Sequence, residues 1–126
     1  MTGITYDTGA LVAGERNDRR AWALHARTLE RGILPIVPSV VLAEAWRGGP
    51  QANLARLLDG CLVEALDESS ARAAGAALKR SSTDDVSDAV VVTGALHRGD
   101  AVVTSDRRDL ERLSDALGKR LAIIDV

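Results

Sequence analysis

Strand patterns and helix patterns alternate along these 126 residues, and no other feature of the sequence limits the fold as strongly. Short runs of strand-forming residues are separated by longer Ala-rich or amphipathic runs with helical spacing. Such alternation is typical of α/β folds, in which helices cover both faces of a parallel sheet. We therefore predict one α/β domain over residues 1–126, with a central, mostly parallel sheet of about five strands.

Turn-forming and capping residues mark the ends of the expected elements. Thr8, Ser39 and Asp67 are candidate helix N-caps. Gly32 and Gly99 are candidates to end helices. Strands are expected at residues 4–6, 33–37, 61–66, 101–104 and 121–125. Helices are expected at residues 9–13, 18–31, 40–46, 51–58, 68–80, 86–98 and 107–117.

The composition narrows the class of protein. Apolar residues make up 46% of the chain and charged residues 27%, which indicates a globular rather than a disordered chain. Aromatic residues make up 2%, so the core must be aliphatic and a flat aromatic platform for stacking bases is not expected. The net charge of −2 gives no basic field for wrapping nucleic acid, although an acidic metal pocket would itself add negative charge.

The cellular setting follows from three features of the sequence. Cys61 is the only cysteine, so no intrachain disulfide can form. Met1, Thr2 and Gly3 lead into the first expected strand without the pattern of a signal peptide. No apolar run approaches the length of a membrane span. We therefore expect a protein of the reducing cytoplasm that does not associate with membranes.

Four carboxylates stand out because each lies beside apolar or small residues. Asp7 ends the first expected strand and Asp106 follows the fourth, so both belong to the sheet edge where α/β folds bind ligands. Asp88 lies in the first turn of an apolar helix, and Glu44 lies in a helix otherwise suited to burial. Helix capping or the helix dipole would explain each aspartate singly. Pairing with Arg47 would explain Glu44.

The four carboxylates are more informative together than singly. Two carboxylates about 4 Å apart repel by roughly 4 kcal/mol at an effective dielectric constant of about 20. Three or four in one place would need protonation or a cation. A site made of oxygen atoms alone suits magnesium or manganese. His25 and His97 have no ligand-like spacing and are expected to be packing or surface residues, and Cys61 a small core residue.

In their order and spacing these residues resemble the PIN-domain ribonucleases. The resemblance rests on Asp7-Thr8 after a strand, Glu44 in an apolar helix, Asp88-Ala89 opening a helix, and Thr104-Ser105-Asp106 after a strand. It covers essentially the whole chain. The length, and the run from Thr104 to Leu110, look most like the VapC toxins of bacterial VapBC toxin–antitoxin pairs.

The resemblance implies a role for each matching residue. The metal-binding and catalytic acids would be Asp7, Glu44, Asp88 and Asp106. Thr104 would support the site through hydrogen bonds, and Asp109 would be an auxiliary acid. Gly9 departs from the family, because many relatives carry Ser or Asn there, and this leaves one supporting hydrogen bond in doubt.

The implied activity is metal-dependent hydrolysis of RNA by an endoribonuclease toxin. Asp7 and Asp88 would hold the principal Mg²⁺ ion, or Mn²⁺, and a second metal is not excluded. Glu44 or Asp106 would accept the proton of the attacking water. The expected partners are a second copy of the chain and a VapB-like antitoxin, whose C-terminal segment would lie across the pocket. Six arginines near acidic segments are either phosphate contacts or ordinary surface residues: Arg16, Arg19, Arg20, Arg47, Arg107 and Arg108.

Three alternatives stay open from the sequence. A phospho-acceptor receiver domain is disfavoured, because the first strand ends in a single acid and no Lys follows the last strand. A non-catalytic binding module of the same fold would work through a protein partner alone. A PIN-type nuclease outside any toxin–antitoxin pair would keep the chemistry. The sequence decides neither the RNA that is cut nor the size of the assembly.

Overall fold

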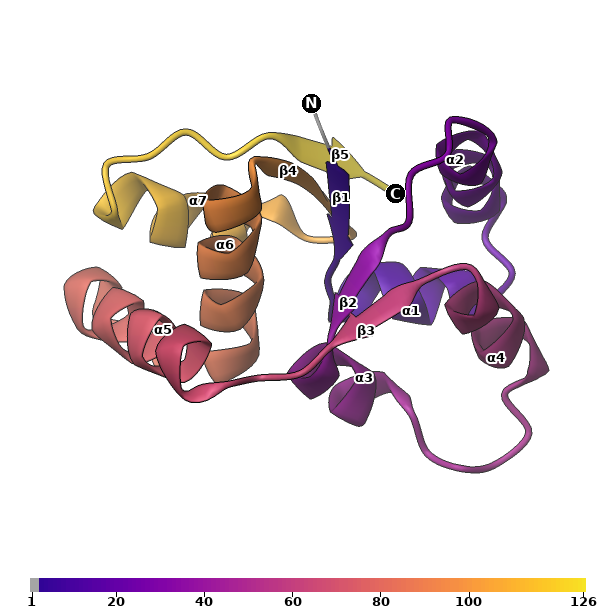
Figure 1. The fold of residues 1–126 in the computed structure, drawn as a ribbon, viewed down its shortest axis with the longest axis horizontal. Helices are drawn as coiled ribbons and strands as arrows, with labels where there is room; N and C mark the ends of the chain where they lie inside the picture. The colour runs from indigo at the N-terminus through magenta and orange to yellow at the C-terminus, as the bar shows by residue number, and fades with distance from the viewer. Residues whose placement is uncertain (1–2) are drawn as a thin grey trace.

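A five-stranded parallel sheet forms the centre of the fold, drawn in Figure 1. The computed structural model describes residues 3–126; Met1 and Thr2, which the sequence places ahead of the first strand, lie outside the described residues. The strands are β1 (Gly3–Tyr6), β2 (Ile36–Pro38), β3 (Leu62–Glu64), β4 (Asp100–Thr104) and β5 (Ile123–Asp125). They stand in the order β3-β2-β1-β4-β5, and every described pairing is parallel.

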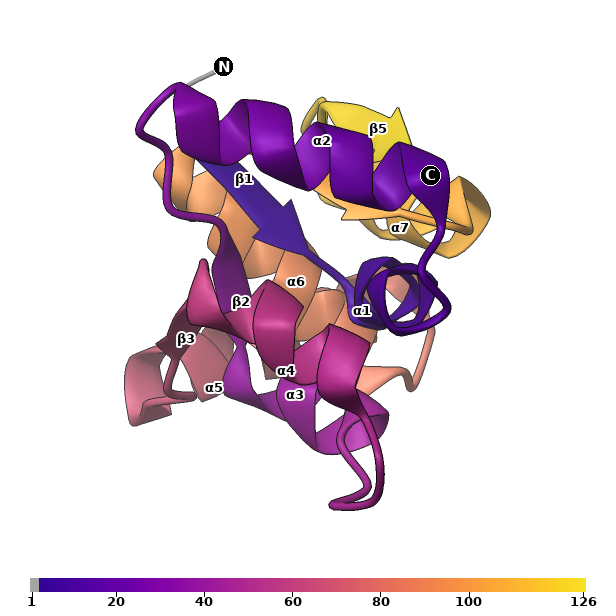
Figure 2. The same cartoon turned by 90° about the vertical axis from the view of Figure 1, so that its right-hand side faces the viewer.

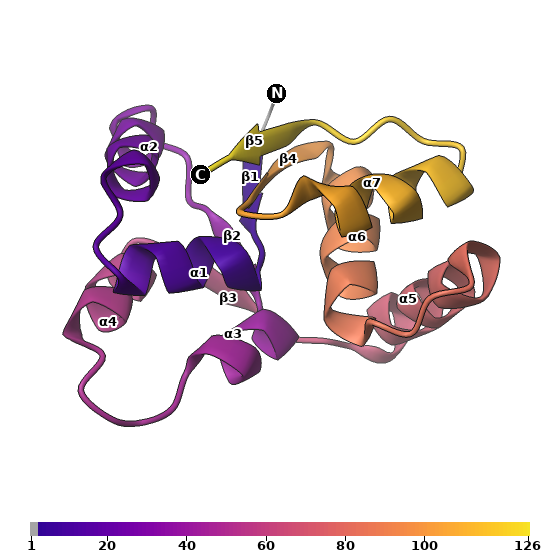
Figure 3. The same cartoon turned by 180° about the vertical axis from the view of Figure 1, so that it is seen from behind.

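Helices cover both faces of this sheet, which confirms the predicted α/β class. They are α1 (Thr8–Glu15), α2 (Arg19–Glu30), α3 (Ser39–Ala45), α4 (Ala52–Asp59), α5 (Glu68–Ser81), α6 (Val86–Arg98) and α7 (Arg107–Ala116). Helices α1, α2 and α4 lie on one face and α5, α6 and α7 on the other, as Figures 1 and 3 show from opposite sides. Figure 2 looks onto the face that carries α1, α2 and α4. No helix within residues 3–126 is long and apolar enough to cross a membrane.

The strand order reverses at β1, and α/β folds in general bind ligands near such a reversal. From β1 the chain moves outward to β2 and β3, then returns to β4 on the other side of β1 and ends at β5. The connections on the two sides of β1 therefore cover opposite faces, and α/β folds bind ligands in the crevice outside the carboxyl ends of the strands at such a point, here those of β1 and β4. Tyr6 and Val103 are partners at that end of the β1–β4 pair, so the residues that follow them share one edge.

The core is aliphatic, as the scarcity of aromatic residues predicts. Val102 and Val103 of β4 and Val91 and Val92 of α6 are all buried. Helix α6 buries more than one side because it contacts β1 and β4 as well as helices α5 and α7. The apolar character of α6 is therefore explained by packing.

A buried polar pair attaches α2 to the sheet. The Tyr6 hydroxyl and His25 Nδ1 are 2.8 Å apart, and the Trp22 ring meets the His25 ring edge-on. Burial lowers the pKa of His25 and raises the pKa of Tyr6. His25 thus has the packing role expected from the sequence, and His97 is exposed. Cys61 is partly buried and packs against the core, as expected.

Two of the predicted N-caps are wrong by one residue. Thr8 and Ser39 are the first residues of α1 and α3 rather than their caps. Asp7 caps α1 because its carboxylate accepts a hydrogen bond from the Ala10 amide at 2.9 Å. Pro38 precedes α3 and makes no side-chain capping bond. The predicted cap at Asp67 is confirmed by its bond from the Ser70 amide at 2.8 Å, and Gly99 ends α6 with φ 75°.

Strands β2 and β3 are shorter than predicted, and proline explains part of the difference. Pro35 has no amide hydrogen to donate to a ladder, and β2 begins only at Ile36. The Pro35 carbonyl accepts from the Leu62 amide at 2.8 Å, which starts the pairing with β3. Pro38 then ends β2 and leads directly into α3.

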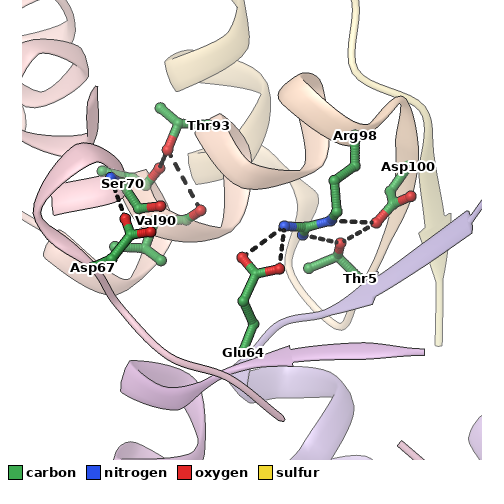
Figure 4. Close-up of polar contacts among 9 residues, drawn as sticks. Thr5, Glu64, Asp67, Ser70, Val90, Thr93, Arg98 and Asp100 are labelled. Carbon is green, nitrogen blue, oxygen red and sulfur yellow. Dashed lines mark hydrogen bonds and ion pairs between the residues drawn. The ribbon is translucent and has the colours of Figure 1, made fainter. Parts of the chain in front are cut away.

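Arg98 joins the end of α6 to three strands, as Figure 4 shows. Its Nε donates to Asp100 at 2.9 Å and its Nη2 donates to the Thr5 hydroxyl at 2.8 Å. Its Nη1 donates to both Glu64 carboxylate oxygens, at 2.9 and 3.1 Å. Thr5 also donates to Asp100 at 2.8 Å. The Oδ2 atom of the buried Asp100 carboxylate therefore accepts two hydrogen bonds, one of them from a cation that compensates its charge.

Candidate active site

Asp7 is held rigidly at the end of β1. Its backbone amide donates to the Val103 carbonyl at 3.2 Å, and its carboxylate caps α1 through Ala10. The residue is 7% exposed. Burial raises the pKa of Asp7, hydrogen bonds from Thr104, Ala10 and Gly9 lower it, and the charge of Asp106 raises it. The structure therefore fixes one carboxylate at the crevice between β1 and β4, where the sequence predicted it.

Asp88 lies partly buried in the first turn of α6. Its backbone amide donates to the Asp85 carboxylate at 2.9 Å, so Asp85 is the N-cap of this helix. Burial raises the pKa of Asp88 to about 7, and repulsion by Asp85, Asp7, Asp109 and Glu44 adds to the rise. These carboxylates therefore lie close enough to Asp88 to raise its pKa, although they come from separate segments of the chain.

Glu44 is exposed at the last turn of α3, so the predicted burial of this residue is wrong. Its Oε1 accepts a hydrogen bond from the Thr8 hydroxyl at 2.7 Å. Arg47 does not pair with it, because Arg47 Nη1 donates to the carbonyls of Ala43 and Trp46 at 3.2 and 2.9 Å. The bond from Thr8 instead ties Glu44 to the residue next to Asp7.

Thr104 connects the ends of β4 and β1. Its side chain is fully buried, and its hydroxyl accepts from the Asp106 amide at 3.0 Å. The same hydroxyl donates to the Asp106 carbonyl at 3.2 Å and also lowers the pKa of Asp7 by hydrogen bonding. Asp106 itself is exposed and caps α7 by accepting from the Arg108 amide at 3.3 Å. Thr104 thus makes hydrogen bonds at the ends of both strands, and its supporting role in a metal site stays a prediction.

Asp88 and Asp109 line a cavity of about 330 Å³ beside the loop between α5 and α6. Asp109 is an exposed residue in the first turn of α7. The remaining lining residues are Ser82, Thr83, Asp84, Asp85, Arg112 and Leu113. The cavity is strongly acidic, and Arg112 is its one basic lining residue.

The carboxylates are gathered at one edge but do not form a finished metal shell. Within residues 3–126, no group of three or more His, Cys, Asp or Glu side chains is arranged so that it could hold a metal ion. The donor set consists of carboxylate oxygens, which suits magnesium or manganese. A divalent cation would also remove the repulsion that raises the pKa of Asp88. The chemistry of the donors therefore fits such an ion.

The arginines named from the sequence have different surroundings. Arg107 donates to both Asp125 carboxylate oxygens, at 3.0 and 2.7 Å, and to Glu111 at 3.1 Å. Arg20 lies 3.4 Å from the Asp125 carbonyl. Arg108 is exposed beside Asp106 at 3.8 Å, while Arg16 and Arg19 are also exposed. Arg107 is thus committed to the C-terminal strand, and Arg108 remains accessible at the crevice.

The geometry explains the glycine that departs from the family pattern. A Cβ atom on Gly9 would overlap Ser105 Oγ and would lie 3.3 Å from Asp7 Oδ1. The missing side chain therefore makes room for Ser105 beside the Asp7 carboxylate.

Solved structures share this architecture over most of the chain. One chain in the crystal structure of VapBC2 from Rickettsia felis, bound to a promoter DNA fragment, is 14% identical with a TM-score of 0.73, and the match covers 98% of each chain. One chain in DNA-bound VapBC from Salmonella typhimurium is 24% identical with a TM-score of 0.69, covering 99% of this chain and 98% of that one. A toxin–antitoxin complex from Klebsiella pneumoniae matches at 14% identity and a TM-score of 0.63, covering 85% and 89%. The chain has a PIN-like fold. No protein-family model and no curated protein matches the sequence.

Two contributors to the edge of this PIN-like fold were not recognised from the sequence. Thr8 looked like a helix cap, yet its hydroxyl holds Glu44. Ser105 was given no role of its own from the sequence, yet it fills the space beside Gly9. The available signal was their position directly after Asp7 and Thr104. Contacts between segments so far apart in the chain cannot be read from local patterns.

Proposed function

We propose that this chain is a metal-dependent endoribonuclease and the toxin of a type II toxin–antitoxin pair. One observation supports the chemistry above all others. The pKa of Asp88 is raised to about 7 partly by the charges of Asp7, Glu44 and Asp109, at the crevice where α/β folds bind ligands. Such crowding of carboxylates is a cost to folding unless a cation or a proton offsets it. A bound Mg²⁺ ion would offset the repulsion between these carboxylates, and this supports the proposal of a Mg²⁺-dependent reaction.

In the proposed mechanism each residue acts from the position just described. Asp7 and Asp88 would hold the ion, with Glu44 and Asp106 completing its surroundings. A bound divalent ion lowers the pKa of water and stabilises negative charge on a phosphodiester. Glu44 or Asp106, both exposed, would take the proton from the attacking water. Thr104 keeps Asp7 in place, and Thr8 keeps Glu44 directed toward the same edge.

The partners follow from the structures that share the fold. Those structures are described as VapBC bound to DNA and as a toxin–antitoxin complex. We therefore propose that this chain binds a VapB-like antitoxin, forms a homodimer and works in the cytoplasm, where its RNA substrate would be found. An antitoxin Arg that reached the crevice would pair with carboxylates that now repel one another.

Cleavage of a labelled RNA with and without Mg²⁺ tests the chemistry. Asp7→Ala and Asp88→Asn should remove cleavage while leaving the circular dichroism spectrum unchanged. Asp59→Asn is the matched control, because Asp59 is exposed at the end of α4, on the face away from α6. It should cut at the wild-type rate. Wild-type cleavage by purified Asp88→Asn would refute the assignment of the site.

A non-catalytic binding module is the second candidate. It is favoured by the absence, among residues 3–126, of carboxylates already arranged to hold a metal ion. Such a module would bind its protein partner equally well with Mg²⁺ or with a chelator, and would cut no RNA under either condition.

A further inference from the structure

Trp46 is an exposed indole next to the carboxylate edge. It directly follows α3 and lies two residues after Glu44, and it is 41% exposed. The other tryptophan, Trp22, has different surroundings. Trp22 packs against the core, donates its Nε1 hydrogen to the Gly14 carbonyl at 2.9 Å, and carries Arg56 over its ring. Trp46 is thus a large aromatic ring that the packing of the core does not explain.

The loop after Trp46 is fixed on one side and open on the other. Gln51 holds it, because its Nε2 donates to the Ala45 carbonyl at 2.9 Å and its Oε1 accepts from the Arg47 amide at 2.7 Å. A Cβ atom on Gly48 would meet only Trp46 Nε1, at 4.0 Å, and one on Gly49 would meet nothing within 4 Å. The backbone next to the indole is therefore held by hydrogen bonds, and the space along the glycines of the loop is open.

A cation accompanies the exposed ring. The Arg47 guanidinium is held at the end of α3 by the carbonyls of Ala43 and Trp46. Both bonds use Nη1, and Arg47 is exposed. Helix α3 contacts α1 and α6, the two helices that follow Asp7 and carry Asp88. The helix that ends next to Trp46 and Arg47 therefore packs against the helix that follows Asp7 and the helix that carries Asp88.

We propose that Trp46 stacks on an unpaired base of the RNA whose backbone lies at the carboxylates, so that this chain selects single-stranded RNA. The inference rests on the proposed nuclease function. Bases of a duplex are already stacked on their neighbours, whereas an unpaired base offers a free π-face to an aromatic ring. Arg47 would contact a neighbouring phosphate, which positions the strand without reading its sequence. The composition excludes a platform of several rings, but one ring suffices for one base.

Kinetics of cleavage give the first test. Trp46→Ala should raise KM for a single-stranded RNA roughly 5- to 100-fold, the range that loss of one stacked base produces. Its kcat should stay near the wild-type value, because stacking acts on bound substrate and transition state alike. Trp46→Phe should recover most of the loss. Leu34→Ala removes another exposed apolar side chain, 52% exposed and before β2, and should leave both constants unchanged.

Fluorescence gives a second readout that does not depend on turnover. Trp22→Phe leaves Trp46 as the sole tryptophan, because the chain has two. Mixing this variant with a single-stranded RNA oligonucleotide and Mg²⁺ should quench its emission before cleavage proceeds. A duplex of the same sequence should quench it much less. Trp46→Phe, which reports from Trp22 alone, should show neither change.

The outcomes separate this inference from the function on which it rests. If the wild type cuts RNA in an Asp88-dependent manner but Trp46→Ala keeps the wild-type KM, the stacking role alone is refuted. If the wild type neither binds nor cuts RNA, the proposed function fails first and the stacking role fails with it. Emission that changes with protein concentration, without RNA, would assign Trp46 to an interface between copies and would also overturn the inference.

Discussion

Ionisation of the Asp88 side chain affects both the candidate site and the stability of the folded state. Its pKa is raised from 3.8 to about 7, first by burial and then by the surrounding carboxylates. Because the folded-state pKa lies above the unfolded-state value, ionisation of Asp88 opposes folding. The stability that the neutral form provides is complete below the unfolded-state pKa and is lost as the pH rises through about 7.

Removing that ionisation should stabilise the protein at neutral and alkaline pH. Asp88→Asn should gain about 1–2 kcal/mol at alkaline pH in a chelator, a value reduced from the full pKa shift because the side chain is only partly buried. The gain should shrink as the pH falls toward the unfolded-state pKa. Urea unfolding across this pH range measures the difference, and parallel curves for the two proteins would contradict the expectation.

Magnesium should stabilise the same residue in its charged form. Under the proposed function, Mg²⁺ raises the melting temperature of the wild type, because a ligand that binds only the folded state stabilises it increasingly as its concentration exceeds the dissociation constant. Asp88→Asn should respond weakly, and the exposed control Asp59→Asn should respond like the wild type. Equal shifts in all three proteins would show that the ion binds elsewhere.

At the scale of elements, α6 is fixed at both ends by different chemistry. Its first turn brings Asp88 to the crevice, and its last residue, Arg98, binds Thr5, Asp100 and Glu64. Loss of the second attachment would leave the Asp100 carboxylate buried without its cation. The same helix therefore carries Asp88 at one end and the cation that compensates Asp100 at the other.

Arg98→Met should destabilise the protein by about 2–4 kcal/mol, because it leaves a buried charge uncompensated. Arg72→Met provides the comparison, since Arg72 and Glu68 are both 79% exposed in their pair and should contribute well under about 1 kcal/mol. The double variant Arg98→Met/Asp100→Asn should recover part of the loss. Denaturant unfolding of the wild type and the three variants measures these differences in the free energy of unfolding.

At the scale of the whole molecule, the central elements are more buried than the elements at the periphery. Strand β4 is the most completely buried element and α6 is the most buried helix, whereas Leu62 and Val63 of the edge strand β3 are 49% and 42% exposed. Helix α2 is attached chiefly through His25 and Trp22. Opening of the periphery should therefore cost less free energy than opening of the centre.

Native-state hydrogen exchange tests this order of stability. The amides of β4 and of the middle of α6 should exchange only through global unfolding. Those of α2 and β3 should exchange through smaller openings, with weaker dependence on denaturant. Protection of α2 equal to that of β4 would indicate a single cooperative unit instead.

The sequence-based predictions are accurate where neighbouring residues determine the structure, and they fail where contacts between distant segments determine it. Helix α6 has its predicted bounds because an Asp cap and a C-terminal Gly are local signals. The burial predicted for Glu44 fails because apolar neighbours along a helix do not tell which side faces a neighbouring element. The cluster around Arg98 could not be predicted, since Thr5 and Arg98 meet only through the strand order. The roles of the four acids as metal ligands stay predictions.

The crowding of Gly9 against Ser105 constrains how this chain can diverge. A side chain added at position 9 would enter the space that Ser105 occupies, so residues 9 and 105 should vary together in related sequences. Lineages that acquire a side chain at the first are expected to carry a smaller or reoriented residue at the second.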